Sequence, residues 1–349
     1  MKTKCIRIAV AGLGRIGWNF HCNQIARHRQ FELIAVADPE PERRREAETV
    51  RGCRSYEAFE TMITNEELDA VVVATPTHFH KAHALAAFRK GLHVFLEKPM
   101  ALTYADARVI ACAARRAKRV LTVYQPNRAW AWFQHLCRIV RSGRIGTPYH
   151  VYGSMCRYVR RNDWQSLKKY GGGMLNNYGA HLLDQALYLT GNRVARVFCN
   201  MRRVAAMGDA EDVVKIVYET RDGALGEVDI NQASAVPGNE FKVLGTHGAV
   251  VKRSLEELHV TWYNPRDLKK RRLDSHLASA DRKYPRDRIP FKEKTIAVNP
   301  RYEVDVYKNL AQAIRTGAAP MARPEETLAV MKVMELGRAD ARRIRVTPI

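Results

Sequence analysis

Long apolar runs and paired cysteines are both missing from this sequence. No stretch approaches the roughly 18 to 20 apolar residues that a membrane-spanning helix needs, and the N-terminal residues lack the apolar core of a signal peptide. The seven cysteines are odd in number, scattered and never spaced as C-x-x-C, which indicates neither a disulfide framework nor a zinc site. We therefore expect a soluble, cytoplasmic protein.

Acidic residues are scarce relative to basic ones, and the formal net charge is +22. Such a charge suits a protein that binds polyanions. However, the basic residues form short clusters without interleaved aromatic side chains, and no helix-turn-helix, zinc-finger or RNP pattern accompanies them. We interpret them as solvated surface and do not expect nucleic-acid binding. The basic segment 264–288 has no interpretable motif, and an insertion, an oligomer contact and a charged flap all remain open.

A glycine-rich loop is the first feature that the sequence does contain. Residues 6–11 predict a strand, and Gly12, Gly14 and Gly17 follow it in the pattern G-x-G-x-x-G before a predicted helix. In a dinucleotide site the first glycine permits a tight turn, and the second lets the backbone approach the pyrophosphate. The third lets the helix pack closely on the sheet.

The second predicted strand, residues 32–37, ends at an acidic residue. Asp38 lies about twenty residues after the last glycine, where a dinucleotide site places its ribose ligand. A carboxylate there accepts hydrogen bonds from the ribose hydroxyls and repels a 2′-phosphate, which favours NAD. Arg43 and Arg44 lie nearby in the sequence and soften this preference, so NADP stays possible.

The following segment alternates between strands and helices. The next predicted elements are strands at 69–74, 94–96 and 120–124 and a helix at 104–118. This alternation predicts a parallel, doubly wound sheet with helices on both faces. The strand at 94–96 runs into Glu97, Lys98 and Pro99. Because ligands bind at the carboxyl ends of parallel strands, this charged strand end is a candidate site.

Three histidines follow another strand end, behind Thr75 and Pro76. His78, His80 and His83 have a spacing at which imidazoles sometimes converge on a metal. Against a metal site, Thr75 and Pro76 form a predicted turn, the segment from His80 onward looks helical, and no carboxylate or thiol lies within the cluster. We favour a helix N-terminus beside a bound cofactor and expect no metal.

Beyond residue 125 the pattern changes to strands joined by short turns. The predicted strands lie at 147–153, 193–203, 212–219, 223–230 and 240–244. Their spacing is typical of a mostly antiparallel sheet in an α+β domain. A predicted helix at 174–189 carries Asn177, His181 and Asp184, whose spacing of four and three residues places them on one helical face.

These motifs, taken in order, resemble the Gfo/Idh/MocA family of nicotinamide-dependent oxidoreductases. They are the glycine loop, Asp38, Thr75-Pro76, Glu97-Lys98-Pro99, Asn127-Arg128, residues 142–146, the glycines at 171–173 and residues 179–184. The resemblance covers nearly the whole chain. It implies an α/β Rossmann domain at 1–125 that binds NAD(P), and an α+β domain at 126–349 with a large, mostly antiparallel open sheet. The second domain binds substrate and forms homodimers or homotetramers through the open sheet, and its C-terminal helix, predicted at 324–338, packs back on the first domain.

The resemblance also implies residue roles. Lys98 touches the reacting hydroxyl or carbonyl, the bond before Pro99 is cis, and His181 contacts the hydroxyl that is oxidised. The residues expected to bind cofactor are Gly12, Gly14, Arg15, Ile16, Gly17, Asp38, Arg43, Thr75, Pro76, His80, Glu97, Lys98 and Asn127. Those expected to bind substrate are Lys98, Arg128, Trp164, Asn177 and His181. Trp164 either supplies an apolar platform for a sugar ring or anchors its loop on the second domain. The arginines of the same basic loop either bind a carboxylate or phosphate on the substrate or face solvent, and they are Arg157, Arg160 and Arg161.

One position departs from the commonest family pattern. Many members have an aspartate where this chain has Asn177. An amide cannot titrate, so Lys98 and His181 are expected to carry proton transfer, with Asn177 as a hydrogen-bonding placeholder. An amine with the unperturbed pKa of about 10.4 is a poor base at neutral pH. We therefore expect burial or neighbouring cations to lower the pKa of Lys98, with Glu97 as its structural counterweight.

We predict an NAD(P)-dependent dehydrogenase or reductase that acts on CH–OH groups. A hydride moves between nicotinamide and a carbinol or carbonyl carbon of a sugar, inositol or related polyol. Two alternatives remain open. One is an NAD-dependent glycoside hydrolase that oxidises its substrate transiently, and the other is a non-catalytic protein that binds nicotinamide or sugar.

Overall fold

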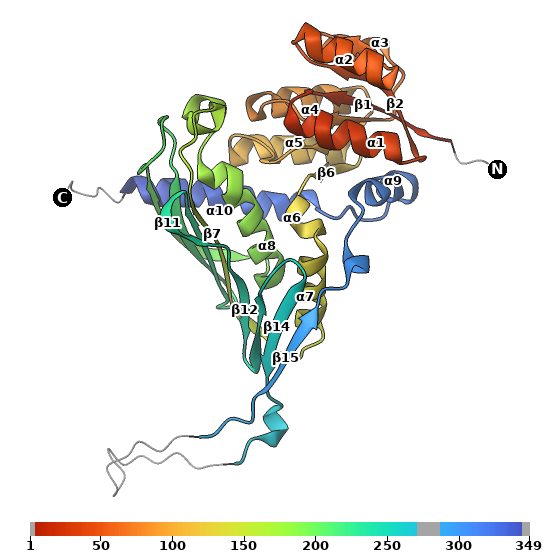
Figure 1. Ribbon diagram of the computed structural model, residues 1–349. Helices are drawn as coiled ribbons and strands as arrows, with labels where there is room; N and C mark the ends of the chain where they lie inside the picture. Colours follow the sequence, from red (N-terminus) through yellow and green to blue (C-terminus); the bar gives the residue numbers. More distant parts are fainter. Residues whose placement is uncertain (1–3, 271–286, 344–349) are drawn as a thin grey trace, which may run out of the picture.

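The computed structural model describes residues 4–270 and 287–343. It contains two sheets. The first is formed by the N-terminal third of the chain and the second by the rest, and Figure 1 shows them at opposite ends of the molecule with helices between them.

The first sheet has six parallel strands in the order β3-β2-β1-β4-β5-β6. Its strands are β1 (Ile6–Ala11), β2 (Phe31–Ala37), β3 (Arg54–Tyr56), β4 (Ala70–Val73), β5 (His93–Leu96) and β6 (Leu121–Val123). The order reverses between β1 and β4, as in dinucleotide-binding folds, where ligands bind at this switch point. The predicted parallel sheet is confirmed. The sequence did not predict β3, which has only three residues and is partly exposed.

Helices cover both faces of this sheet, as predicted. They are α1 (Asn23–Arg27), α2 (Pro41–Arg51), α3 (Phe59–Asn65), α4 (His80–Arg89) and α5 (Tyr104–Ala117). The helix after the glycine loop begins with a π-helical turn, Gly17–Cys22. The face of the sheet that this turn covers is also covered by α9 (Val306–Thr316), which comes from the distant C-terminal part of the chain. Its residues Tyr307 and Leu310 belong to the same apolar cluster as the side chains of β1. The far end of the chain therefore helps to build the first core.

The second sheet is mixed and has the order β15-β14-β13-β12-β7-β10-β9-β8, with β11 also paired to β7. Its strands are β7 (Pro148–Tyr158), β8 (Val194–Arg202), β9 (Val213–Thr220), β10 (Leu225–Asn231), β11 (Ala233–Gly238), β12 (Phe241–Gly245), β13 (Gly248–Lys252), β14 (Glu257–Trp262) and β15 (Lys292–Ala297). Among the strand pairs that the structure describes here, β7 and β10 are parallel and the others antiparallel. The prediction of a mostly antiparallel sheet is confirmed.

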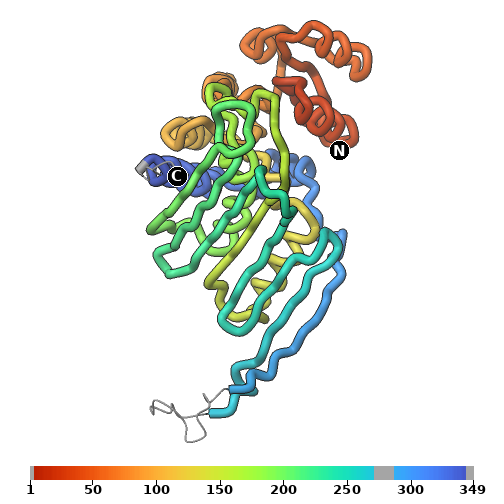
Figure 2. Tube along the Cα trace, turned by 60° about the vertical axis from the view of Figure 1, so that its left-hand side comes forward, coloured from red at the N-terminus to blue at the C-terminus, as the bar shows by residue number. Residues whose placement is uncertain are grey.

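One face of the second sheet packs on helices and the other stays open. The helices of this part are α6 (Pro126–Ala129), α7 (Ala131–Arg141), α8 (Ala180–Thr190) and α10 (Pro324–Arg343). Ile216 and Ile230 are fully buried on the covered face, whereas Phe198 on the opposite face is 50% exposed. Figure 2 shows the open face of the strands turned towards the viewer.

The last helix joins the two parts of the molecule. Helix α10 contacts α8 and β8 of the second part and α5 and β6 of the first, and Figure 1 shows it between the two sheets. It is longer than the predicted helix at 324–338. In the described part of the chain, no helix has the length and apolar character of a membrane span. Of the basic segment 264–288, residues 271–286 lie outside the described residues.

Candidate active site

The glycine loop leaves room for a ligand at one position and none at two others. Gly12 has φ of +88°, and a Cβ there would lie 2.6 Å from the Ala74 carbonyl oxygen. A Cβ on Gly17 would lie 1.8 Å from the Gly12 carbonyl oxygen, whereas one on Gly14 would meet nothing within 4 Å. The loop and the helix therefore pack as a dinucleotide site requires, and the space above Gly14 fits a pyrophosphate. Arg15 is exposed beside it.

Asp38 at the end of β2 is tied to this loop. The carboxylate is 3% exposed, and it accepts hydrogen bonds from the Leu13 amide at 2.6 Å and the Glu40 amide at 3.0 Å. Arg43 Nη1 lies 3.5 Å from it. Asp38, the predicted ligand of the ribose, therefore lies beside the glycine loop, and the guanidinium of Arg43 lies next to it. These residues fit an NAD-type cofactor.

His80, predicted to bind cofactor, fastens two loops instead. The imidazole is 1% exposed, Nε2 lies 2.9 Å from the Thr75 carbonyl oxygen, and Nδ1 lies 3.0 Å from the Pro99 carbonyl oxygen. A neutral imidazole has one N–H and donates to only one of these two carbonyl oxygens. Because the ring is almost completely buried between them, the prediction of cofactor contact by His80 is corrected. The side chain thus links the loops that follow β4 and β5, at Thr75 and Pro99.

The other histidines of this segment point elsewhere. His78 is exposed, whereas His83 lies 3.1 Å from the Thr75 hydroxyl and stacks on Phe59. In the described part of the chain, no three histidine, cysteine or acidic side chains come close enough to hold a metal ion. The spacing of the three histidines reflects the start of a helix.

Lys98 lies between the two parts of the molecule. It follows β5, and the bond to Pro99 is cis, as expected. The ammonium Nζ donates to the Asn177 backbone oxygen at 3.1 Å and to its side-chain Oδ1 at 3.2 Å. Burial lowers the pKa of Lys98 to about 8; the nearby Glu97 opposes this, and the positive charges of two arginines, Arg15 and Arg161, act with it. An amine with this pKa exchanges protons near neutral pH, as proton transfer requires.

Glu97 is held by His21, which is held in turn by Tyr307, and the sequence did not single out either residue. Its Oε2 accepts from the Lys98 amide at 3.1 Å, and its Oε1 lies 3.0 Å from His21 Nε2. The other ring nitrogen of His21 lies 2.8 Å from the hydroxyl of Tyr307. His21 and Tyr307 are both fully buried, and they come from the π-helical turn after the glycine loop and from α9. Glu97 is thus fixed next to Lys98, and both of its carboxylate oxygens have hydrogen-bond partners within the protein.

Asn177 is held in one orientation from both sides. Because an ammonium can only donate, the amide oxygen of Asn177 must face Lys98, and its NH₂ group must face away. That group donates to Gln165 Oε1 at 2.8 Å. The Gln165 carbonyl oxygen accepts from the Gly173 amide at 2.8 Å, and a Cβ on Gly172 would lie 2.5 Å from it. Sequence reasoning missed Gln165, although its partner glycines were noted.

The predicted helix at 174–189 forms in two parts, a π-helical turn at Leu175–Gly179 and then α8. The expected common face therefore splits. His181 is 9% exposed, its pKa is held well below its usual value by burial and by the charge of Lys98, and Nδ1 has no hydrogen-bond partner within the described residues. Nδ1 is enclosed by the protein, whereas Nε2 is neither enclosed nor hydrogen-bonded within the described residues, so Nε2 is the ring nitrogen that suits a substrate hydroxyl. Asp184 points away.

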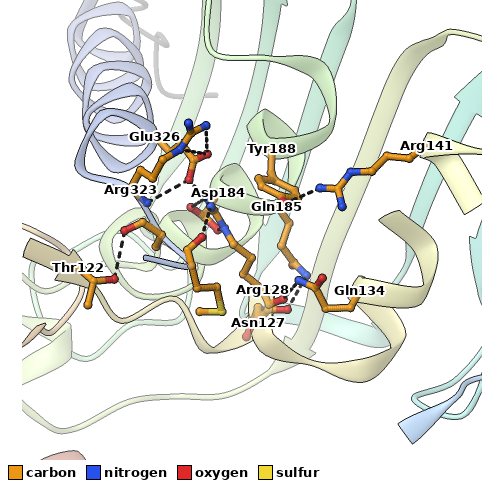
Figure 3. A network of polar contacts seen from close by, with 12 residues as sticks. Thr122, Asn127, Arg128, Gln134, Arg141, Asp184, Gln185, Tyr188, Arg323 and Glu326 are labelled. Carbon is orange, nitrogen blue, oxygen red and sulfur yellow. Dashed lines mark hydrogen bonds and ion pairs between the residues drawn. The ribbon is translucent and has the colours of Figure 1, made fainter. Parts of the chain in front are cut away.

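Arg128 is not a substrate ligand, and this prediction is wrong. The residue is 1% exposed, and Figure 3 shows its guanidinium enclosed by Asp184 and Glu326. Nε donates to Asp184 at 2.9 Å, and Nη1 donates to the Met321 carbonyl oxygen at 3.0 Å. This buried network joins α6, α8 and the start of α10, so Arg128 positions the helix that carries His181 and does not reach the cleft.

Asn127 and Trp164 are two further residues that the sequence predicts to contact a ligand. The Asn127 carbonyl oxygen accepts from Gln185 Nε2 at 3.3 Å, as Figure 3 shows, while its side chain is partly exposed. Trp164 is 47% exposed at the start of the short turn that contains Gln165. Contact of either side chain with a ligand stays a prediction.

Two protein-family models match this chain. One, an oxidoreductase family with an NAD-binding Rossmann fold, matches residues 6–125, and the GFO/IDH/MocA C-terminal domain matches residues 133–251. The chain belongs to the Gfo/Idh/MocA oxidoreductase family. The predicted family, the Rossmann cofactor domain and the class of enzyme are thereby confirmed.

Named members of the Gfo/Idh/MocA family are similar over most of their length. The chain is 29% identical over 266 residues to myo-inositol 2-dehydrogenase of Thermotoga maritima, covering 73% of this chain and 77% of that protein. It is 25% identical over 267 residues to the NAD⁺-dependent scyllo-inositol 2-dehydrogenase of Bacillus subtilis, covering 73% and 76%. The WlbA dehydrogenase of Bordetella pertussis, solved with NADH and UDP-GlcNAcA, shares the fold with a TM-score of 0.78 at 24% identity, covering 97% of each chain.

Proposed function

We propose that this protein oxidises a CH–OH group of a sugar or polyol, or reduces the corresponding carbonyl, with Lys98 and His181 as the catalytic residues. The observation that carries the assignment of residues is the Lys98 amine, with a pKa of about 8, held against Asn177 at the carboxyl end of β5. The inositol dehydrogenases among its relatives support the substrate class. Asp38 favours NAD over NADP.

A bound nicotinamide supplies hydride transfer, and the protein supplies binding, orientation and proton transfer. The residues that would hold this cofactor are the glycine loop and Asp38. Lys98 Nζ takes the hydroxyl proton during oxidation and returns it to the carbonyl oxygen during reduction. His181 holds the same oxygen through Nε2, the ring nitrogen that the protein does not enclose. Asn177 cannot titrate, so it keeps the ammonium in place without competing for the proton.

The experiment is a panel of sugars and polyols tested with NAD and with NADP, followed through nicotinamide absorbance. We expect net reduction of NAD with at least one member, and loss of the rate in Lys98→Ala. Glycoside cleavage without a net absorbance change would instead indicate the hydrolase, which none of the relatives described above supports. A protein that binds NADH but turns over no member of the panel would fit the non-catalytic alternative.

We also propose that the open face of the second sheet forms the contact between subunits in a homodimer or homotetramer. Phe198, Val213 and Lys215 line a shallow hollow on this face. Phe198 and Val204, which are 50% and 63% exposed, both line this hollow, and exposed apolar side chains that lie together indicate a protein contact. Light scattering of the wild type and of Phe198→Asp tests this, and an unchanged mass would exclude this face. The cytoplasmic location stays a prediction.

A further inference from the structure

The loop that follows β7 brings cationic side chains to the substrate side of Lys98. Arg161 forms an ion pair with Asp163, with Nε 3.1 Å from Oδ1. The same Oδ1 accepts from the Gln165 amide at 3.0 Å. Gln165 in turn holds Asn177, the partner of Lys98. Arg161 is therefore fixed to the short turn that borders the catalytic amine, and its charge reaches Lys98.

A second arginine contacts the residue that follows Asn177. Arg157, at the end of β7, donates to the hydroxyl of Tyr178, and its guanidinium lies 5.4 Å from the ring centroid. Tyr178 directly follows Asn177 in the π-helical turn. Arg157 is exposed, and within residues 4–270 and 287–343 no carboxylate forms an ion pair with it. Its guanidinium keeps donors for a further partner.

The nearby carboxylates already have partners within the protein. Asp163 is ion-paired with Arg161, and the oxygens of Glu97 are bound to His21 and to the backbone. Glu211, which lines a small pocket with Arg161 and Gln165, accepts from the Leu175 amide. Asn177 adds no charge. Arg15 in the glycine loop faces the expected diphosphate of the cofactor, so it does not need a substrate anion. A neutral sugar would leave the guanidinium of Arg157 without an ionic partner, whereas an anionic one would supply that partner.

We propose that the substrate is a sugar or polyol that bears an anionic group, a carboxylate or a phosphate, which Arg157 and Arg161 bind while Lys98 and His181 meet the reacting hydroxyl. This inference rests on the proposed function. Guanidinium groups form paired hydrogen bonds with both kinds of anion, so the shared chemistry is an oxyanion next to a polyol.

The test compares matched substrates that differ only in the anion. Glucose, glucuronate and glucose 6-phosphate form one series, and the galactose and mannose equivalents form two more. In at least one series we expect kcat/KM for an anionic member to exceed that of the neutral parent by about 10- to 100-fold, as for hydrogen bonds to charged groups. Added salt should reduce this advantage. The uronate and phosphate arms distinguish the two anions.

Variants assign the effect to the loop. Arg157→Gln should lower kcat/KM for the anionic substrate about tenfold or more, with little change for the neutral parent. Arg161→Gln should lower kcat/KM for the anionic substrate more than for the neutral parent, whose rate also changes because the charge of Arg161 acts on Lys98. Arg196→Gln is the matched control, because Arg196 is an exposed arginine on β8, paired with Glu219. Equal losses with neutral and anionic substrates in the two loop variants would mean a structural role and would overturn the proposal.

The outcomes also separate this proposal from the proposed function. Oxidation of neutral sugars that depends on Lys98, with no anionic member preferred, would leave the oxidoreductase assignment standing and refute the anion site. If no substrate turns over, the Tm of the NADH-loaded protein decides. A larger increase with an anionic sugar than with its parent, lost in Arg157→Gln, supports the anion site, and equal increases refute it.

Discussion

Aspartate at position 177 would put a carboxylate where the Lys98 ammonium now meets an amide oxygen. The change is nearly isosteric, since it replaces one NH₂ group by oxygen. It introduces a full negative charge 3.2 Å from Lys98 Nζ, the distance at which Oδ1 now lies. The Gln165 amide must then turn its NH₂ group towards the new oxygen, because its own carbonyl oxygen now accepts there at 2.8 Å.

The size of the effect follows from Coulomb's law. At 3.2 Å, two unit charges interact by about 5 kcal/mol with an effective dielectric constant near 20 and by about 1.3 kcal/mol in bulk water. Since a pKa difference of one corresponds to about 1.4 kcal/mol, Asn177→Asp should raise the pKa of Lys98 by about 1 to 4. The amine that has a pKa of about 8 in the wild type would then titrate well above neutral pH.

The assay is the pH dependence of kcat/KM for substrate oxidation, from about pH 6 to about pH 10.5. Oxidation needs a neutral amine to accept the proton, so the wild-type rate should rise to a plateau through an apparent pKa near 8. In Asn177→Asp this rise should move to higher pH. The rate at neutral pH should fall about tenfold each time the pKa of Lys98 increases by one. Reduction needs the protonated amine, so its activity should extend to higher pH.

The neighbouring residue provides the charge control. Asn176 lies beside Asn177, but its side chain contacts the Gly171 carbonyl oxygen and Arg338, away from Lys98. Asn176→Asp therefore adds the same charge without facing the amine, and its pH profile should stay close to that of the wild type. An unshifted profile in Asn177→Asp would refute Lys98 as the titrating base.

Three further predictions concern the cofactor loop, the amine and the buried network. Lys98→Ala should lower kcat about 10²- to 10⁴-fold while NADH binding, measured by fluorescence titration, stays within about threefold; a large loss of binding would contradict this. Gly17→Ala should lower the Tm, because its Cβ would lie 1.8 Å from a backbone oxygen. Gly14→Ala should keep the Tm and weaken NADH binding, because its Cβ would meet only the space expected for the pyrophosphate. The reverse pattern would refute this assignment of the two glycines. Arg128→Met leaves the carboxylates of Asp184 and Glu326 without their cationic partner and should lower the free energy of unfolding in urea by about 3–5 kcal/mol. An unchanged free energy of unfolding would show that the two carboxylates become protonated at little cost.

The Rossmann half of the fold could be predicted because its determinants are local. Apolar strands such as β1 and β4 are buried on both faces and read as short continuous apolar runs. The glycine spacing and Asp38 then fix where a dinucleotide fits. Lys98 could be found for the same reason, since a charged residue directly after a buried strand is conspicuous at the sheet edge where ligands bind.

The partners of these residues could not be predicted, because they are distant in the sequence. Tyr307 reaches His21 across 286 residues, and Glu326 reaches Arg128 across 198. Arg128 was expected to bind substrate because it follows the last Rossmann strand. Its burial depends on α10, whose position relative to α6 no local pattern reveals. Gln165 lies in an irregular loop, where neither periodicity nor a motif distinguishes it from its neighbours.

The roles proposed for Lys98 and His181 account for an asparagine at position 177. Burial lowers the pKa of both Lys98 and His181, and the positive charge of Lys98 further disfavours a proton on His181. Both shifts favour the neutral forms, and Lys98, with a pKa of about 8, is the one of the two groups that exchanges its proton near neutral pH. An aspartate at position 177 would hold this proton more tightly. Asn177 keeps the ammonium in position by two hydrogen bonds but leaves the pKa near 8, so the proton can leave Lys98 and be replaced by that of the substrate.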